Sequence, residues 1–182
     1  MRPNPIFLIG FMGAGKTTLG RALEAILPNW RYIDLDNEVE RQAGMPISKI
    51  FSIYGEGAFR KMERKALAET ARIDTPVIVG CGGGTPCFFD NMEYMNSLGT
   101  TILLQARNST LLRRLLDAQA QRPKLNGLSP QEVEKFIINT LAERDKWYSK
   151  SQYKFPSDRL ETPAEIEATC RLFIRKFINR NE

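Results

Sequence analysis

Residues 6–18 read Ile-Phe-Leu-Ile-Gly-Phe-Met-Gly-Ala-Gly-Lys-Thr-Thr, and this stretch decides the fold of the chain. The apolar run at its start predicts a buried strand over 5–10, and apolar residues recur at helical spacing over 16–27. Between them lies the spacing G-x-x-x-x-G-K-T, which is typical of a phosphate-binding loop when a strand precedes it and a helix follows. The stretch therefore predicts a nucleotide-binding protein with its phosphate loop at 10–18.

Each fixed position of this loop has a chemical reason. Gly10, Gly13 and Gly15 let the backbone turn tightly and point N–H groups at a phosphate, while the helix adds the positive end of its dipole. Lys16 is expected to reach the β- and γ-phosphates, and the Thr17 hydroxyl to ligate Mg²⁺. The predicted ATP-binding residues of the loop are Gly13, Ala14, Gly15, Lys16, Thr17 and Thr18.

Composition indicates one soluble globular domain over residues 1–182. Of its residues, 42% are hydrophobic and 26% are charged, which is ordinary for such proteins. The net charge of +5 suits a polyanionic substrate such as ATP. No basic run or basic–aromatic interleaving suggests nucleic acid, and no apolar run approaches the roughly eighteen residues of a membrane span. We expect a cytoplasmic monomer with no nucleic-acid or membrane partner.

The cysteine and histidine content excludes several chemistries. Cys81, Cys87 and Cys170 show no metal-ligand spacing, so neither a zinc site nor a disulfide framework is expected. The chain has no histidine, so acid–base work falls to carboxylates or lysines.

Strands and helices alternate along the chain, which predicts an α/β fold with a parallel sheet and ligands at the carboxyl ends of its strands. The expected strands are 5–10, 31–34, 76–80, 100–105 and a weaker one at 155–160. The expected helices are 16–27, 37–43, 57–72, 108–121, 130–147 and one that begins at the capping box of residues 162–165.

Two polar or glycine-rich segments follow strand ends. Asp34 and Asp36 stand two residues apart, and in an extended segment their carboxylates point the same way. One can hold Mg²⁺ while the other meets a substrate hydroxyl. The alternative is a helix N-cap for 37–43. Gly82–Gly84 implies close approach to the backbone, or else a flexible loop.

Three arginines form a further candidate group. Arg60 stands one turn before Glu63, so an i,i+3 pair can fix its guanidinium. Arg144 belongs to a predicted helix, and Arg122 lies in the polar loop 121–130. Taken singly, each arginine is most simply interpreted as a solvated surface residue. Together, their planar guanidinium groups are suited to bind a carboxylate and a transferring phosphoryl group.

These motifs together resemble the shikimate kinase family over nearly the whole chain. In order they are G-x-x-G-x-G-K-[ST], D-x-D, F-R-x-x-E, G-G-G, R-P and E-R-x-x-x-Y. They stand at Gly10–Thr17, Asp34 and Asp36, Phe59-Arg60 with Glu63, Gly82–Gly84, Arg122-Pro123, and Glu143-Arg144 with Tyr148.

The resemblance implies a P-loop nucleoside-monophosphate-kinase-like fold in three layers, with a central five-stranded parallel sheet flanked by helices. It also implies an acceptor-binding segment at about 36–64 and a lid at about 113–128. The activity implied is transfer of the ATP γ-phosphate to the 3-hydroxyl of shikimate, which gives ADP and shikimate 3-phosphate on the route to chorismate and the aromatic amino acids. The partners implied are ATP and shikimate, with Mg²⁺ as cofactor.

The resemblance also implies roles for matched residues. The catalytic set is Lys16, Asp36 and Arg122, with Arg122 on the lid. Asp34 joins Thr17 near Mg²⁺, and Arg114 resembles the arginine that stacks on adenine, with Thr162-Pro163 beside it. The implied acceptor-binding residues are Asp36 for the ring hydroxyls, Arg60 and Arg144 for the carboxylate, and Gly82, Gly83 and Gly84 for the ring.

Two departures and two alternatives accompany this interpretation. Lys124 replaces the first leucine of the usual R-P-L-L lid, and residues 151–154 do not match the usual alanine–aspartate pair, so the register of the last strand is open. One alternative is another P-loop small-molecule kinase, such as a gluconate or nucleoside monophosphate kinase. The other is a nucleotide-binding module without transfer activity. Whether Asp36 abstracts a proton or only orients the hydroxyl stays open.

Overall fold

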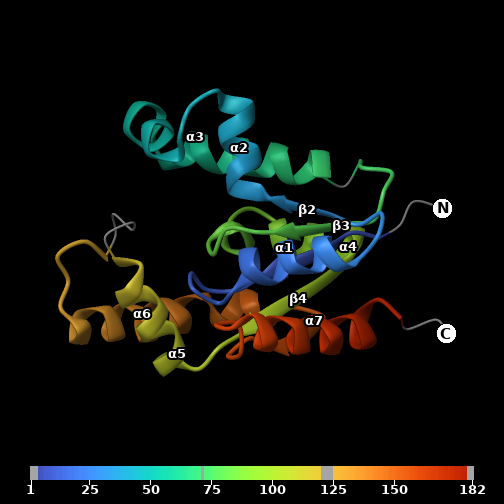
Figure 1. Cartoon of the computed structure of the whole chain (residues 1–182). Helices are drawn as coiled ribbons and strands as arrows, with labels where there is room; N and C mark the ends of the chain where they lie inside the picture. Colours follow the sequence, from blue (N-terminus) through green and yellow to red (C-terminus); the bar gives the residue numbers. More distant parts are fainter. Residues whose placement is uncertain (1–3, 71, 120–124, 180–182) are drawn as a thin grey trace.

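The computed structural model describes residues 4–70, 72–119 and 125–179 (Figure 1). Its strands are β1 (Ile6–Ile9), β2 (Arg31–Asp34), β3 (Val77–Gly80), β4 (Thr100–Gln105) and β5 (Tyr153–Pro156). Its helices are α1 (Lys16–Ile26), α2 (Leu35–Ala43), α3 (Ile47–Thr70), the 3₁₀ turn η1 (Thr85–Cys87), α4 (Asn91–Leu98), α5 (Asn108–Asp117), α6 (Pro130–Tyr148) and α7 (Pro163–Phe177).

The five strands form one parallel sheet in the order β2-β3-β1-β4-β5. This confirms the predicted α/β fold with a five-stranded parallel sheet. β1 and β3 are buried along their whole length, because helices cover both faces of the sheet. The strand order reverses beside β1, and in such sheets ligands bind at the carboxyl ends of the strands at this point.

Two apolar clusters, one on each face of the sheet, make the three layers. On one face α1, α5, α6 and α7 pack through residues such as Leu19, Leu115 and Phe173. On the other face α2, α3 and α4 pack through residues such as Leu35 and Leu67. Figure 1 shows α2 and α3 beside the β2 edge, with α5, α6 and α7 toward the opposite edge. None of the described helices is long and apolar enough to cross a membrane.

Several predicted boundaries were wrong. The helix expected over 57–72 is the second part of α3, and the pattern missed the first part, which begins at Ile47 and ends at the non-helical Gly55 (φ 78°, ψ 173°). α2 begins at Leu35, because Asp34 already caps it. The sequence pattern also missed η1 and α4. The apolar side of α4 is small, because Met92 and Met95 are its buried apolar residues.

The last strand was predicted too late in the chain. It spans Tyr153–Pro156 rather than 155–160, with Phe155 buried in the core and Tyr153 aligned with Ile102 of β4. Residues 157–161 leave the sheet and turn toward the phosphate loop. α5 ends at Asp117, and Arg122 and Lys124 of the predicted lid lie outside the described residues.

Candidate active site

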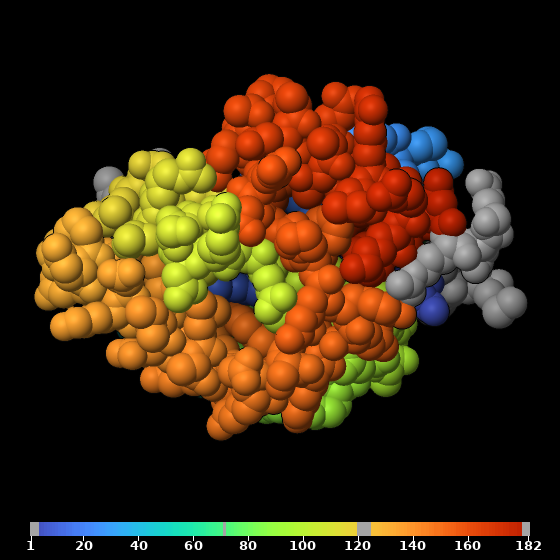
Figure 2. All heavy atoms as spheres, turned by 90° about the horizontal axis from the view of Figure 1, so that it is seen from below, coloured from blue at the N-terminus to red at the C-terminus, as the bar shows by residue number. Residues whose placement is uncertain are grey.

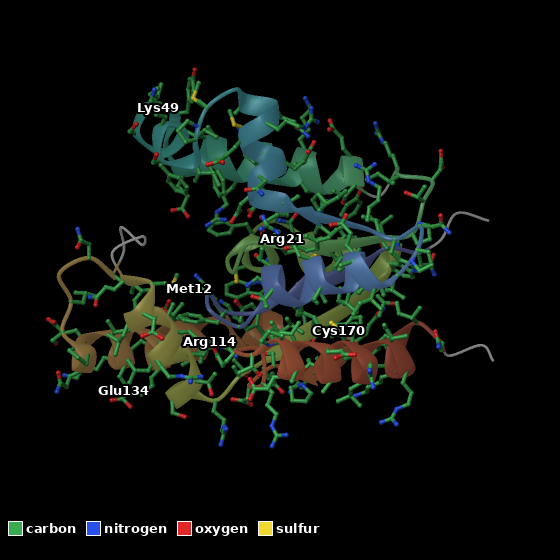
Figure 3. All side chains as sticks on the ribbon, in the orientation of Figure 1. Met12, Arg21, Lys49, Arg114, Glu134 and Cys170 are labelled. Atoms are coloured by element: carbon green, nitrogen blue, oxygen red, sulfur yellow. The ribbon has the colours of Figure 1, made fainter. Side chains whose placement is uncertain are left out.

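A cavity of about 390 Å³ lies at the carboxyl ends of β1, β2 and β3, in front of the first turn of α1. Two of its lining residues are labelled in Figure 3: Met12 of the phosphate loop and Arg114 of α5. The predicted site residues that line it are Gly13, Gly15, Lys16, Thr17, Thr18, Asp34, Asp36, Gly82, Gly83 and Arg114.

The phosphate loop needs its glycines for both conformation and packing. Gly10, Gly13 and Gly15 have φ of 143°, 80° and 93°, values that other residues rarely adopt. A Cβ at Gly10 would stand 2.8 Å from the carbonyl oxygen of Leu104, and one at Gly15 would stand 2.4 Å from Leu160 Cδ1. The back of the loop therefore rests directly on neighbouring elements.

Lys16 folds back onto the loop that carries it. Its Nζ donates to the carbonyl oxygens of Gly10 (2.7 Å) and Phe11 (3.0 Å). Burial lowers the pKa of Lys16 to about 8, against the opposing effect of the Asp36 carboxylate. A dehydrated ammonium group at this position gains strongly from an arriving phosphate charge.

Asp34 caps α2, which is one of the two alternatives that the sequence offered, and it also contacts Thr17 of the phosphate loop. Its Oδ1 accepts the backbone N–H of Asp36 (3.2 Å), which is the α2 N-cap. Its Oδ2 accepts the hydroxyls of Thr17 (3.1 Å) and Tyr32 (3.3 Å). The expectation that both carboxylates continue one extended segment was wrong, because the cap places Asp36 in the first turn of α2.

The pair formed by Thr17 and Asp34 fits Mg²⁺ by its donor chemistry. Hydroxyl and carboxylate oxygens are hard ligands, and Mg²⁺ is usually held by one or two protein carboxylates together with substrate phosphates and water. Among the described residues no group of three or more His, Cys, Asp or Glu side chains gathers around one point. These two side chains could hold the ion beside the loop.

Asp36 lies next to the first residue of the triple glycine at the wall of the cavity. A Cβ at Gly82 would stand 3.0 Å from Asp36 Oδ1. Burial, followed by the negative charges of Asp34 and Glu63, raises the pKa of Asp36 to about 6. A carboxylate with a raised pKa is a better proton acceptor for a hydroxyl than an exposed one.

Arg60 is fixed on α3 by carboxylates. Its Nη1 donates to Glu63 Oε2 (3.0 Å), so the predicted i,i+3 pair is present, and its Nη2 donates to Glu56 Oε1 (3.1 Å). The guanidinium lies 4.0 Å from the ring centre of Phe88. A Cβ at Gly84 would stand 2.9 Å from Arg60 Nη2, so a larger residue there would displace the guanidinium from this position.

Arg144 reaches the same glycine segment from α6. A Cβ at Gly83 would stand 2.9 Å from Arg144 Nη1. Tyr148, one turn further along α6, donates its hydroxyl to the carbonyl oxygen of Gly83 (2.7 Å). Arg60 and Arg144 therefore meet at Gly83 and Gly84, and these contacts favour close approach over the alternative of a flexible loop.

Sequence reasoning missed two supporting residues of the site, Thr85 and Tyr32. The buried Glu63 also accepts the hydroxyl of Thr85 (2.5 Å), which links α3 to η1. Tyr32 packs so tightly that a Cβ at Gly80 would stand 2.2 Å from its hydroxyl oxygen. Gly20 and Gly80 both pack against Tyr32, but without the fold neither glycine indicates this partner.

A second cavity, of about 250 Å³, lies behind the phosphate loop. Figure 2 shows it as a hollow with dark blue N-terminal atoms visible between the yellow-green and orange segments. Phe11 and Ala14 are among its apolar lining residues, and Asp145 and Lys154 also line it. The predicted site residues do not line this cavity, apart from Ala14 of the loop.

Comparison with known proteins points to one family. The family model described as shikimate kinase matches residues 12–175. The shikimate kinase of Phocaeicola vulgatus is 45% identical over 175 residues, which cover 96% of this chain and 98% of the relative. That of Bacteroides thetaiotaomicron is 44% identical over 166 residues, which cover 91% and 94% of the two chains.

Solved structures agree with the sequence matches. The crystal structure of shikimate kinase from Bacteroides thetaiotaomicron has a TM-score of 0.89 at 41% identity and covers 95% of this chain and 97% of that chain. The shikimate kinase of Acinetobacter baumannii in complex with shikimate has a TM-score of 0.80 at 28% identity and covers 99% and 96% of the two chains.

Proposed function

The chain belongs to the shikimate kinase family, and from this premise we propose how its residues carry out the ATP-dependent phosphorylation of shikimate. One observation carries the proposal: a single cavity joins a phosphate loop to a glycine segment that two arginines approach from different elements. The acceptor in our proposal is the 3-hydroxyl of the ring, and the product is shikimate 3-phosphate.

On the nucleotide side, the loop residues and Lys16 bind the phosphate chain. Phosphoryl transfer requires alignment and neutralisation of developing negative charge more than covalent chemistry. Lys16 leaves the carbonyls of Gly10 and Phe11 and turns to the β- and γ-phosphates. Thr17 and Asp34 would hold Mg²⁺, which supplies charge neutralisation between the phosphates. Arg122, from the predicted lid, adds a second positively charged side chain besides Lys16.

On the acceptor side, Arg60 and Arg144 bind the carboxylate of shikimate, and the backbone of Gly82–Gly84 lies against the ring. Asp36 accepts a hydrogen bond from the ring hydroxyl, and its raised pKa suits it to take the proton as the O–P bond forms. Fixing the acceptor at both ends holds the hydroxyl in line with the γ-phosphate.

We further propose that the protein works as a single-domain monomer in the cytoplasm, with residues 36–64 as its acceptor-binding segment and 113–128 as its lid. The three free cysteines are compatible with a reducing compartment.

An acceptor panel tests this function. With ATP and Mg²⁺, ADP release should require shikimate, and phosphorus NMR should detect one new phosphate monoester at the 3-position. Gluconate and nucleoside monophosphates should give no release above the blank. Release with either of these acceptors would favour another small-molecule kinase, and ATP binding without any release would favour a non-catalytic module.

Tyr148→Phe should weaken acceptor binding while nucleotide binding stays unchanged. The variant removes the hydroxyl that donates to the Gly83 carbonyl at 2.7 Å, so the glycine segment loses one fixed point. We expect KM for shikimate to rise several-fold and the free energy of unfolding to fall by about 1 kcal/mol, the usual net contribution of one hydrogen bond, because Gly83 is half-buried at the cavity wall. Steady-state kinetics and thermal unfolding measure both, and an equal rise in KM for ATP would contradict the assignment.

A further inference from the structure

Arg114 lies on α5 beside the phosphate loop, where it lines the first cavity, and 13% of its side chain is exposed. Its Nη1 donates to the carbonyl oxygen of Gly13 (2.9 Å), and its Nε donates to Glu161 Oε1 (2.7 Å). Its Nη2 donates to the carbonyl oxygens of Ser157 and Asp158, both at 3.0 Å. One planar guanidinium therefore joins the phosphate loop to the segment that follows β5.

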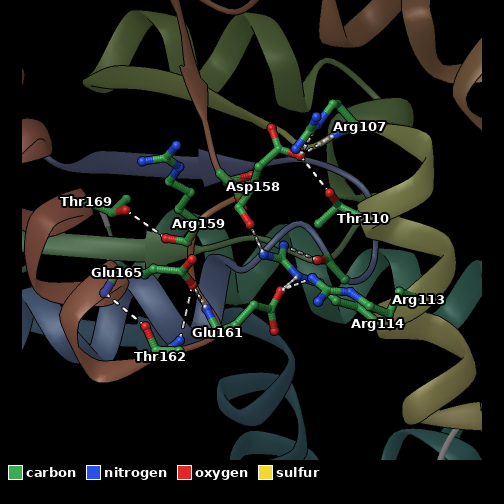
Figure 4. Close-up of polar contacts among 12 residues, drawn as sticks. Arg107, Thr110, Arg113, Arg114, Asp158, Arg159, Glu161, Thr162, Glu165 and Thr169 are labelled. Atoms are coloured by element: carbon green, nitrogen blue, oxygen red, sulfur yellow. Dashed lines mark hydrogen bonds and ion pairs between the residues drawn. The ribbon is translucent and has the colours of Figure 1, made fainter.

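This segment, residues 157–161, is named here the β5–α7 turn, and it is held from both sides (Figure 4). From the α5 side, the hydroxyl of Thr110 donates to Asp158 Oδ1 (2.7 Å), as does the backbone N–H of Arg107 (2.9 Å). From α7, the hydroxyl of Thr169 donates to the carbonyl oxygen of Arg159 (2.7 Å). Hydrogen bonds from α5 and α7 therefore fix the position of the β5–α7 turn.

The phosphate loop packs directly on this support. A Cβ at Gly13 would stand 3.4 Å from Leu115 Cδ2 of α5, and a Cβ at Gly15 would stand 2.4 Å from Leu160 Cδ1. Since glycines have many accessible conformations, the loop needs contacts from outside itself to stay in one of them. An anion site also needs N–H groups, not carbonyl oxygens, turned toward the phosphate.

We propose that Arg114 is a positioning residue that holds the phosphate loop in its anion-binding conformation by bonding the Gly13 carbonyl and anchoring it to the β5–α7 turn. This inference rests on the assignment of residues 10–18 as the phosphate loop, and it goes beyond the adenine contact that family resemblance implies. The two roles are compatible, because the hydrogen bonds of a guanidinium lie in its plane and leave its faces free for stacking.

Amide hydrogen exchange of the ligand-free full chain tests the inference without any nucleotide. Arg114→Lys keeps the positive charge but cannot form the fork, so exchange over residues 10–18 should become about tenfold faster while the strands keep their protection. Arg113→Ala is the matched control, because Arg113 donates to the same Glu161 Oε1 (2.8 Å) from an exposed position and should leave the loop unchanged.

Calorimetry with two probes gives a second readout. Arg114→Lys should lower the affinity for inorganic tripolyphosphate about tenfold and the affinity for ADP by at least as much, because both probes need the loop and ADP also carries the adenine. A loss for ADP with unchanged tripolyphosphate affinity would show an adenine contact alone and overturn the inference. If tripolyphosphate does not bind the wild type, the exchange comparison decides.

The exchange result also separates this inference from the proposed function. Unchanged exchange over residues 10–18 in Arg114→Lys overturns the positioning role, and so does an equal increase throughout the β strands, which would mean general destabilisation. A wild-type protein that fails to bind ADP would instead contradict the nucleotide site itself.

Discussion

Lys16→Met should lower kcat for phosphoryl transfer by at least about a hundredfold, because removing one preorganised charge or donor from a transition state costs about 10²–10³ in rate. The ammonium group of Lys16 is half-buried inside the loop, where it donates to the carbonyls of Gly10 and Phe11, and it is partly shielded from water before it turns to a phosphate. Methionine fills a similar volume, so the fold should persist. ADP release with shikimate measures the rate, and circular dichroism measures the fold.

Lys135→Met is the matched control for this variant. Lys135 is an exposed lysine on α6, outside the residues assigned to the site, and its replacement should leave the rate unchanged. If Lys16→Met is folded and retains more than about a tenth of the wild-type rate, the role assigned to Lys16 is wrong.

Arg60→Ala and Arg144→Ala should each cost about 2–5 kcal/mol in kcat/KM for shikimate, the range for removing one partner of a buried charge pair. Arg60 is 12% exposed and held by Glu63, so its guanidinium is preorganised for a carboxylate. Neither arginine is among the residues that line the cavity at the phosphate loop, so affinity for ATP should barely change.

Arg171→Ala controls for the loss of one positive charge. Arg171 is on α7, 76% exposed and paired with Glu167, and its removal should leave kcat/KM within about twofold, as expected of a surface ion pair. Poor ATP binding in Arg60→Ala or Arg144→Ala together with normal shikimate kinetics would mean that the acceptor site has been misplaced.

The features that sequence predicted correctly depend on local chemistry. The phosphate loop follows from glycine and lysine spacing, and the capping box that starts α7 forms as predicted, with Thr162 accepting the N–H of Glu165. The Arg60–Glu63 pair is equally local, being one helical turn long. The parallel sheet followed from alternating buried strands and helices.

The features that sequence missed depend on partners far along the chain. Asn91 joins η1 and α4, because its side chain donates to the carbonyl oxygen of Thr85 (2.8 Å). The hydrophobic periodicity of the sequence does not predict this contact. The register of β5 is set by its alignment with β4. The meeting of Arg60 and Arg144 at the glycine segment requires α3 and α6 to be placed by the whole core.

The most direct measurement of the central claim compares shikimate with its uncharged methyl ester on the wild type, Arg60→Ala and Arg144→Ala. If the two arginines bind the carboxylate, the ester should lower kcat/KM of the wild type by about as much as either substitution does. The variants should lose little more with the ester, because the interaction is already gone. An equal penalty for the ester in all three proteins would show that the arginines do not bind the carboxylate, and would contradict the account.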